Sequence, residues 1–327
     1  MIRYVIKRIL MMIPVLLGVL IIIFALTALC PGDPVTSILG SDAPEEAKEQ
    51  LAEQLGLNDP IYVRFGKYIV NLVTKGDLGT SYITKQPVMG EILNRLPTTA
   101  ILAFGSIIVA ILIGVPLGIL SAVKQYSWID NVSMVLALVG VSMPQFWLGL
   151  LLMLLFAVHL NILPTSGVTN PLGWILPMVT LGFCSAANIA RISRSSMLEV
   201  TRADYIRTAR AKGQKEFKIV MGHAFRNALI PIVTTVGSQV GSMLGGSIAI
   251  ENVFAIPGLG TYMVGAMNAR NYPAIQGGVF FVAIVFSVVN LLVDISYAFI
   301  DPRIMATYQR RKKKKRPDAA SDAAAAG

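Results

Sequence analysis

The chain has 327 residues, of which 54% are hydrophobic and only 14% charged, and its 28 Lys and Arg against 18 Asp and Glu give a formal net charge of +10. A soluble domain carries about 25% charged residues, so this composition argues against an ordinary soluble enzyme, and its high apolar content argues against a disordered chain. The two cysteines, Cys30 and Cys184, are too few for a disulfide framework and lack zinc-site spacing. The class of protein that fits this composition is a polytopic membrane protein.

Six stretches are long and apolar enough to cross a membrane, which takes about 20 helical residues. They are Ile9–Leu29, Thr98–Ala122, Val132–Val158, Gly173–Ala190, Ala228–Ile250 and Gln276–Ile300. The third is interrupted by Pro144, and the fourth is the least apolar. Basic residues before the first stretch would also suit a signal peptide, but its length favours a retained helix. The predicted fold is an all-α polytopic membrane protein with six transmembrane helices.

The distribution of Lys and Arg predicts how these helices are oriented. If both termini are cytoplasmic, 21 of the 28 basic residues lie on the cytoplasmic side, and the short outer loop 160–172 contains none. The larger outer segment 30–97 has nine acidic and six basic residues. We therefore expect the N and C termini to be cytoplasmic.

The outer segment 30–97 has local structure of its own. The run Pro31-Gly32-Asp33-Pro34 predicts a rigid turn, and Ala43–Leu55 predicts a short acidic helix with Pro44 near its start. Two interpretations stay open. The segment either forms an ordered cap over the spans or provides a docking surface for an extracellular partner.

The cytoplasmic segment 191–226 is the most informative stretch, with nine basic and three acidic residues. Met197–Ala211 lacks Gly and Pro and predicts a helix, Gly213 interrupts it, and Glu216–Phe225 resumes helical spacing. Gly at such a break commonly adopts the left-handed conformation that ends a helix. The second helix has an apolar stripe formed by Phe217, Val220, Met221, Ala224 and Phe225. This stripe must bury itself against the chain's own helix ends, lipid or a cytosolic partner.

These residues resemble the coupling loop of binding-protein-dependent ABC importer permeases, and more narrowly the dipeptide/oligopeptide/nickel branch. The resemblance rests on Arg207-Thr208-Ala209-Arg210-Ala211-Lys212-Gly213 and on the run from His223 through Arg226 and Asn227 to Pro231. The general family motif has Glu and Ala where this chain has Arg207 and Thr208, and the gap to Pro231 is longer, as in the peptide branch. Further similarities are Pro31–Pro34, Arg95–Thr98, Glu251–Gly260, Asp294 and Asp301–Arg303.

The resemblance implies a type I importer permease that works within a larger assembly. Its implied partners are a second homologous permease, two cytosolic ATP-binding subunits and an extracytoplasmic substrate-binding protein. The implied ATPase-coupling residues are Arg207, Thr208, Ala209, Arg210, Ala211, Lys212, Gly213, Phe217, His223, Arg226, Asn227 and Pro231. The branch carries dipeptides, oligopeptides, nickel chelates, glutathione or opines, and the binding protein sets which of them is taken up.

Enzymatic chemistry is not indicated. No Gly-x4-Gly-Lys-Ser/Thr phosphate loop occurs in the sequence, so ATP and magnesium are expected on partner subunits and no cofactor on this chain. His159 and His223 are too isolated for a metal cluster or a catalytic triad. Asp294 suits a proton relay or, better, an ion pair with a basic residue near the inner helix ends. For Glu251 the resemblance suggests a structural role beside a gate.

The fifth stretch contains a ladder of glycines that suits either close helix packing or the lining of a pathway. The translocation-path candidates are Gly237, Ser238, Gln239, Gly241 and Gly245, with Gly246 adjoining. In the family this helix lines the route, which keeps the second interpretation open. The basic tail, with four consecutive lysines, predicts attraction to anionic lipid rather than to nucleic acid.

The sequence thus predicts a multi-pass permease subunit in the plasma membrane of a prokaryote, importing di- or oligopeptides. Residues 1–94 are expected to form the first helix and the extracytoplasmic segment, 95–301 the permease domain, and 302–327 a disordered cytoplasmic tail. The alternative is a self-sufficient secondary transporter or channel with a basic regulatory loop. That alternative requires a coupling-ion site within the spans, for which Asp294 is the one candidate found.

Overall fold

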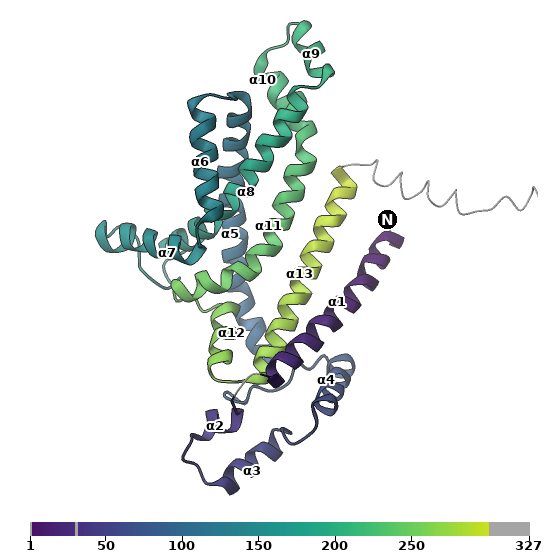
Figure 1. Cartoon of the computed structure of the whole chain (residues 1–327), viewed down its shortest axis with the longest axis vertical. Coiled ribbons are helices and arrows are strands. Elements are labelled where there is room, and N and C mark those ends of the chain that lie inside the picture. Colours follow the sequence, from purple (N-terminus) through teal and green to yellow (C-terminus); the bar gives the residue numbers. More distant parts are fainter. Residues whose placement is uncertain (1, 30–31, 301–327) are drawn as a thin grey trace, which may run out of the picture.

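A computed structural model of the protein describes residues 2–29 and 32–300, and the regular elements within them are helical (Figure 1). The elements are α1 (Ile2–Leu29), α2 (Pro34–Leu39), α3 (Glu45–Gln54), α4 (Ile61–Lys75), α5 (Val88–Val123), α6 (Trp128–Ser142), α7 (Gln145–Leu152), α8 (Ile175–Thr201), α9 (Asp204–Ala211), α10 (Glu216–Lys218), α11 (Arg226–Val253), α12 (Leu259–Asn268) and α13 (Tyr272–Ile300). Met153–His159 and Ile219–Phe225 are π-helical, and Pro171–Trp174 is a 3-10 turn. Of the predicted turn 31–34, Pro31 falls outside the described residues, and so does the whole basic tail.

Five helices within the described residues are long and apolar enough to cross a membrane. The predicted third span is instead a bent pair, in which α6 and the helix Gln145–His159 meet at 109°. Pro144 causes the break because it has no N–H to donate and forces Met143 into an extended conformation, with φ −84° and ψ 129°. Counting the pair as one span confirms the predicted total of six, but not a single straight helix.

The centre of the molecule is the packed pair α5 and α8. A Cβ atom on Gly114 would lie 2.6 Å from the carbonyl oxygen of Ala186, so the two backbones approach as closely as helices can. Leu102, Leu181 and Ile189 are fully buried there. The weak fourth stretch is therefore the most deeply buried of the five spans. Because its neighbours are protein rather than lipid, it does not need a strongly apolar surface.

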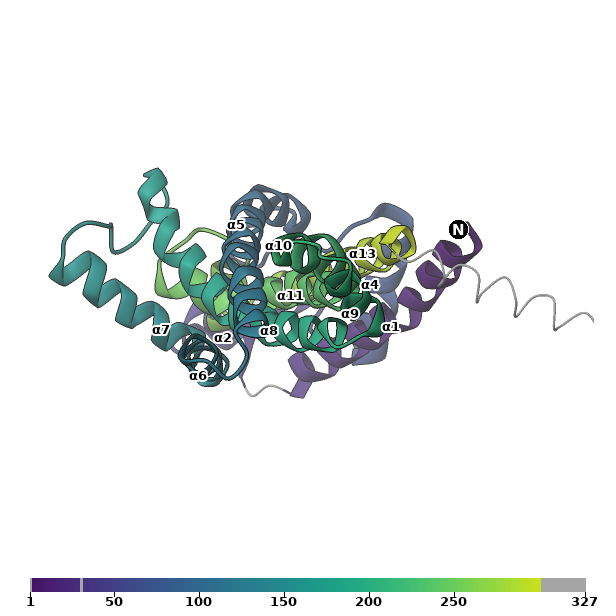
Figure 2. The same cartoon turned by 90° about the horizontal axis from the view of Figure 1, so that it is seen from above.

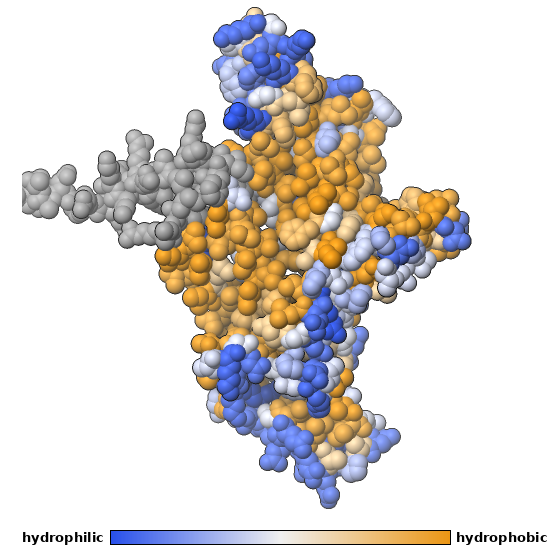
Figure 3. Space-filling view, turned by 180° about the vertical axis from the view of Figure 1, so that it is seen from behind, coloured by the Kyte–Doolittle hydropathy of each residue, from blue (hydrophilic) through white to orange (hydrophobic). Residues whose placement is uncertain are grey.

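The remaining spans surround this pair and present an apolar belt. Figure 3 shows hydrophobic side chains across the middle of one face and hydrophilic ones at both ends. α1 and α13 lie side by side at one edge, and α7 projects from the other (Figures 1 and 2). The Asp294 carboxylate forms an ion pair with the Arg8 guanidinium at 2.7 Å, which confirms the expectation that Asp294 pairs with a basic residue.

The small helices at the two ends follow local sequence signals. Asp33 caps α2 by accepting hydrogen bonds from the N–H groups of Val35 and Thr36. The predicted acidic helix is confirmed as α3, which begins directly after Pro44. By contrast, the helix predicted over Met197–Ala211 is wrong, because Ala203 is extended with ψ 148° and separates α8 from α9. The acidic Asp204, a favourable residue at a helix N-terminus, begins the new helix there.

Candidate functional site: an exposed basic turn and a polar stripe on α11

The basic turn between α9 and α10 stands apart from the helix bundle at one end of the molecule (Figure 1). Gly213 has φ +72° and nothing within 4 Å of where its Cβ would be, so it holds the left-handed position predicted for it. The Arg210 guanidinium donates to Glu216 at 2.6 and 3.2 Å across this turn, and these bonds raise the pKa of Arg210. Gln214 contacts His223 at 2.9 Å. The turn is therefore a defined structure rather than a loose loop.

Most of the predicted coupling residues lie on the surface of this turn. Arg207, Thr208, Arg210, Ala211, Lys212, Gly213, Phe217, Arg226, Asn227 and Pro231 are exposed, His223 is partly buried, and Ala209 is buried. The side chain of Asn227 donates to the carbonyl oxygen of His223 at 2.7 Å. A chain that exposes this many basic groups together presents a surface suited to an acidic or mixed partner.

The apolar stripe predicted after Gly213 divides into two groups. Ile219 and Ala224, together with Ile206 of α9, are fully buried against the C-terminal ends of α5 and α8. Phe217, however, is 79% exposed, and Met221 is also exposed. The chain's own helix ends therefore cover only part of the stripe, and Phe217 and Met221 stay open to the other two expected occupants, lipid or a cytosolic partner. Ile219–Phe225 is a π-helix, whose wider turn brings residues five apart onto one face, as for Ile219 and Ala224.

One face of α11 is exposed along the whole helix, and apart from Ile230 at its edge the side chains there are small or polar. In an α-helix, positions three or four residues apart fall on one face. The exposed positions that follow this spacing are Asn227, Pro231, Thr234, Ser238, Ser242, Gly245, Ala249 and Asn252. A lipid-facing surface would be apolar, as on α1, so this stripe faces either water or another polar protein surface.

The glycine ladder of α11 contributes to two different faces. A Cβ on Gly237 would collide with Val293, and one on Gly241 would lie 2.8 Å from the ring of Phe286, so both glycines pack against α13. Gly245 has open space around it. Positions four apart advance by about 40° around a helix, which carries the ladder from the α13 side to the exposed stripe. Gln239 is partly buried and Ser238 is exposed on the stripe.

A groove of about 690 Å³ lies where the stripe passes α7. Its walls include Gln145 and Phe146 of α7, Gly245, Ala249 and Asn252 of α11, and Val264 of α12. The amide oxygen of Gln145 would lie 2.9 Å from a Cβ on Gly246, so the side chain rests on the glycine backbone. The bend at Pro144 thus places an amide beside the stripe.

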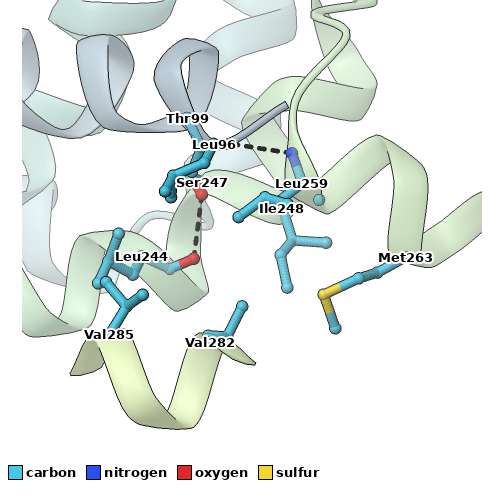
Figure 4. Close-up of a pocket in the computed structure, with 10 residues that line it drawn as sticks. Leu96, Thr99, Leu244, Ser247, Ile248, Leu259, Met263, Val282 and Val285 are labelled. Atoms are coloured by element: carbon cyan, nitrogen blue, oxygen red, sulfur yellow. Dashed lines mark hydrogen bonds between the residues drawn. The ribbon is translucent and has the colours of Figure 1, made fainter. Parts of the chain in front are cut away.

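At the other end of α11, the buried carboxylate of Glu251 organises the connection to α12. It accepts hydrogen bonds from the Thr99 hydroxyl at 2.6 Å, the Gly260 N–H at 2.6 Å and the Thr261 N–H at 3.2 Å. The Leu259 N–H donates to Thr99 at 2.9 Å, as Figure 4 shows. A Cβ on Gly260 would lie 2.5 Å from the backbone of Ile248, so only glycine fits. The cavity beside this cluster has a volume of about 10 Å³, so the side chains around it are closely packed.

A second polar contact strengthens the same end. The Tyr262 hydroxyl donates to Glu91 at 2.8 Å, and the Arg95 guanidinium lies 4.6 Å from the centre of the Tyr262 ring. Burial and the bond to Glu91 both raise the pKa of Tyr262. Sequence analysis singled out Glu251 and Arg95 but missed Thr99 and Tyr262. A signal was present for Thr99, since a buried hydroxyl within an apolar span needs a hydrogen-bond partner, whereas the contact of Tyr262 with Glu91 left none.

Metal or acid-base chemistry has little support in the described residues. Within residues 2–29 and 32–300, no three His, Cys, Asp or Glu side chains gather where they could hold a metal ion. His159 is exposed at the end of the π-helical segment after α7. His223 contacts Gln214 and lies in the basic turn.

Comparisons with known proteins agree with these features. Residues 114–306 match the family "Binding-protein-dependent transport system inner membrane component", and residues 1–103 match its N-terminal membrane component. The dipeptide transport system permease protein DppB of Alkalihalophilus pseudofirmus is 46% identical over 332 aligned positions, covering 93% of this chain and 99% of that protein. The glutathione transport system permease protein GsiC of Salmonella choleraesuis is 45% identical over 304 positions, with the same coverage.

A structural comparison adds the fold. A subunit of the inward-facing MetNI methionine ABC transporter superposes with a TM-score of 0.55 at 20% identity, covering 65% of this chain and 97% of that one. These matches confirm the resemblance drawn from the coupling turn. The chain belongs to the family of binding-protein-dependent transport system inner membrane components, multi-pass permease subunits that act with separate ATPases.

Proposed function

We propose that this chain is a permease subunit of an ABC importer for di- or oligopeptides and that the exposed stripe of α11 lines the translocation path. The single observation that carries the proposal is the polar, small-residue surface that α11 leaves uncovered from Asn227 to Asn252. Small side chains leave room for a solute, and their hydroxyls stay bonded within the helix. Ser242, for example, donates to the carbonyl oxygen of Ser238 at 3.1 Å. A peptide then meets a smooth, uncharged wall.

The stripe and the groove beside Gln145 need a second wall. A second homologous permease, facing this one across the stripe, supplies it and completes the conduction path. The names of the relatives support the substrate class, because one is a dipeptide permease and another a glutathione permease. The substrate arrives from an extracytoplasmic binding protein, which selects it.

Energy enters at the basic turn. Two cytosolic subunits bind ATP and magnesium, and one of them docks on the turn around Gly213, with Phe217 inserted into its surface. Phe217 suits this role because it is 79% exposed on a segment otherwise held by buried Ile219 and Ala224. The turn packs directly on α8 and continues into α11, so movement of an ATPase reaches the path through rigid helices.

This assignment fixes an orientation and a domain plan. Both termini are cytoplasmic, and the Glu251–Thr99 cluster closes the outer end of the path. Residues 1–94 form the first helix and the extracytoplasmic segment, 95–301 the permease domain, and 302–327 a basic cytoplasmic tail near anionic lipid. In the alternating-access cycle, the path is open at the Glu251 end when it is closed at the end beside the basic turn, and closed there when the other end is open.

Reconstitution tests the proposal. The chain is placed in proteoliposomes with its second permease, ATPase subunits and binding protein, and uptake of a labelled dipeptide is measured with internal ATP. Gly245→Leu is expected to abolish uptake, because it fills open space on the stripe. Gly18→Leu is the matched control, since Gly18 of α1 also has open space but faces away from the path. Uptake that needs an ion gradient but no ATPase subunits would favour the secondary transporter instead.

A further inference from the structure

Helix α4 (Ile61–Lys75) is apolar over more of its surface than the protein covers. Phe65, Tyr68 and Leu72 pack toward α1 and belong to the core cluster there. A second group of apolar side chains lies on an adjoining arc of the same helix. Tyr62 is 76% exposed, Val70 59% and Val73 78%. Within the described residues nothing packs over this arc, so it needs an occupant from outside the chain.

The position of α4 relative to α1 identifies the surroundings of that arc. The Phe24 ring lies 5.1 Å from the ring centres of both Phe65 and Tyr68. Phe24 is five residues from the end of α1 at Leu29, which is about 7 Å along the helix axis. α1 presents exposed apolar residues to lipid up to this end, among them Ile22 and Leu26. α4 therefore sits at the depth where the apolar belt meets the headgroups.

The shape and charge of α4 suit the same location. The helix lies across the end of α1, at the edge of the molecule opposite α7 (Figures 1 and 2). Its polar arc carries the exposed residues Lys67, Asn71 and Lys75, and the helix contains no acidic residue. Lys67 pairs with Asp59 at 2.6 Å, outside the helix. An apolar stripe with a basic polar face is the pattern of helices that lie in the membrane interface.

We propose that α4 is an interfacial helix that binds the phospholipid surface. Tyr62, Val70 and Val73 lie among the tops of the acyl chains, and Lys67 and Lys75 lie at the level of the phosphate groups. The helix thereby ties the extracytoplasmic segment to the membrane beside α1. The inference does not depend on the transported solute, and it rests on the proposed orientation only in assigning α4 to the outer leaflet.

Spin labelling of the full chain tests this proposal. In a background with Cys30→Ala and Cys184→Ala, a nitroxide is attached at Val73→Cys or, as the matched control, at Asn71→Cys, two residues away on the polar arc. The chain is reconstituted in vesicles of phosphatidylethanolamine and phosphatidylglycerol. Oxygen partitions into lipid and a nickel chelate stays in water. We expect oxygen to be the stronger relaxant at Val73 and the nickel chelate to be the stronger at Asn71.

A further variant separates lipid binding from simple burial. Val70→Glu is expected to lift the helix, so that a label at Tyr62→Cys becomes more accessible to the nickel chelate and less to oxygen. Equal nickel accessibility at Val73 and Asn71 would place the stripe in water and overturn the proposal. Protection of Val73 from both reagents, appearing only when the binding protein is added, would also overturn it, by showing a protein-docking surface.

Discussion

The guanidinium of Arg194 donates two hydrogen bonds to the carboxylate of Asp130, at 2.6 and 2.8 Å, although the residues are 64 positions apart. The Ser121 hydroxyl and the Tyr126 N–H donate to the same carboxylate. Ser121 is on α5, Asp130 on α6 and Arg194 on α8, so one ion pair joins three helices near the basic turn. The Asp130 side chain is only 3% exposed. Removing either charge would therefore leave the other in a largely buried site.

Replacing Arg194 should destabilise the protein strongly. Arg194→Met leaves a buried carboxylate without its cation, and such a change costs about 3 kcal/mol of unfolding free energy. Arg191→Met is the control, because Arg191 is exposed and its guanidinium donates to the neutral side chain of Asn188. The loss of stability is measured by thermal unfolding in detergent. The measurement compares the two single variants with the double variant Arg194→Met and Asp130→Leu. The double variant should recover much of the loss, and equal midpoints for the two single variants would contradict the role of the pair.

The Arg194–Asp130 pair also shows where sequence reasoning stops. Hydropathy located the spans, because lipid imposes the same requirement on every segment that it surrounds. The charge count, however, assigned Arg194 to a cytoplasmic loop, and Asp130 fell just before the predicted third span. Only the packing of α6 on α8 brings the two together. Long-range polar pairs of this kind leave no periodic pattern in a single sequence.

The coupling turn was predictable in part for a related reason. Gly213 follows from local backbone preferences, which a short segment contains in full. The residues of the apolar stripe after Gly213 were predicted from the spacing of an α-helix. The chain there is π-helical, and it buries Ile219 instead of Phe217. Of the exposed stripe on α11, sequence analysis named Ser238 and Gly245 among its path candidates but not Ser242 or Asn252, because it followed the spacing of the glycines.

Phe217 is predicted to anchor an ATPase subunit. Truncating an exposed aromatic that inserts into a partner typically costs 2 kcal/mol or more, so Phe217→Ser should weaken subunit binding by about 30-fold. Trp128→Ser is the matched control, because Trp128 is 77% exposed but lies at the start of α6, outside the basic turn. Pull-down of the purified ATPase at graded concentrations measures both. An undiminished affinity for Phe217→Ser, with Trp128→Ser weakened, would move the interface to α6.

Gly213 is predicted to be required for coupling rather than for insertion. A β-branched residue at φ +72° costs about 1–2 kcal/mol, so Gly213→Val should distort the turn and reduce ATP-driven uptake. Gly76→Val imposes the same strain, since Gly76 has φ +64° and equally open surroundings, but it ends α4 on the opposite side. Both variants should reach the membrane in normal amounts. Uptake and ATPase binding, measured side by side, should fall for Gly213→Val alone.

Labelling with a membrane-impermeant maleimide checks the orientation on which these predictions depend. In a Cys30→Ala and Cys184→Ala background, Ser166→Cys should react in intact cells, because Ser166 is exposed in the loop without basic residues. Lys215→Cys, exposed in the basic turn, should react only after the membrane is permeabilised. The reverse pattern would place both termini outside.

The Glu251 cluster provides the last prediction. The carboxylate accepts from three donors in a buried site, so Glu251→Gln turns an amide N–H toward a donor and leaves buried groups unpaired, at a cost of about 1–3 kcal/mol. The connection between α11 and α12 should loosen at the outer end while the spans remain in place. A cysteine at the exposed Ala255 should then react faster with an impermeant maleimide in intact cells. Glu91→Gln is the control, because its amide oxygen can still accept from Tyr262.

Because an open outer end lets small solutes leak, vesicles containing the Glu251→Gln complex should also lose a trapped dipeptide without ATP. Tight vesicles with unchanged labelling at Ala255 would show that Glu251 does not close the path.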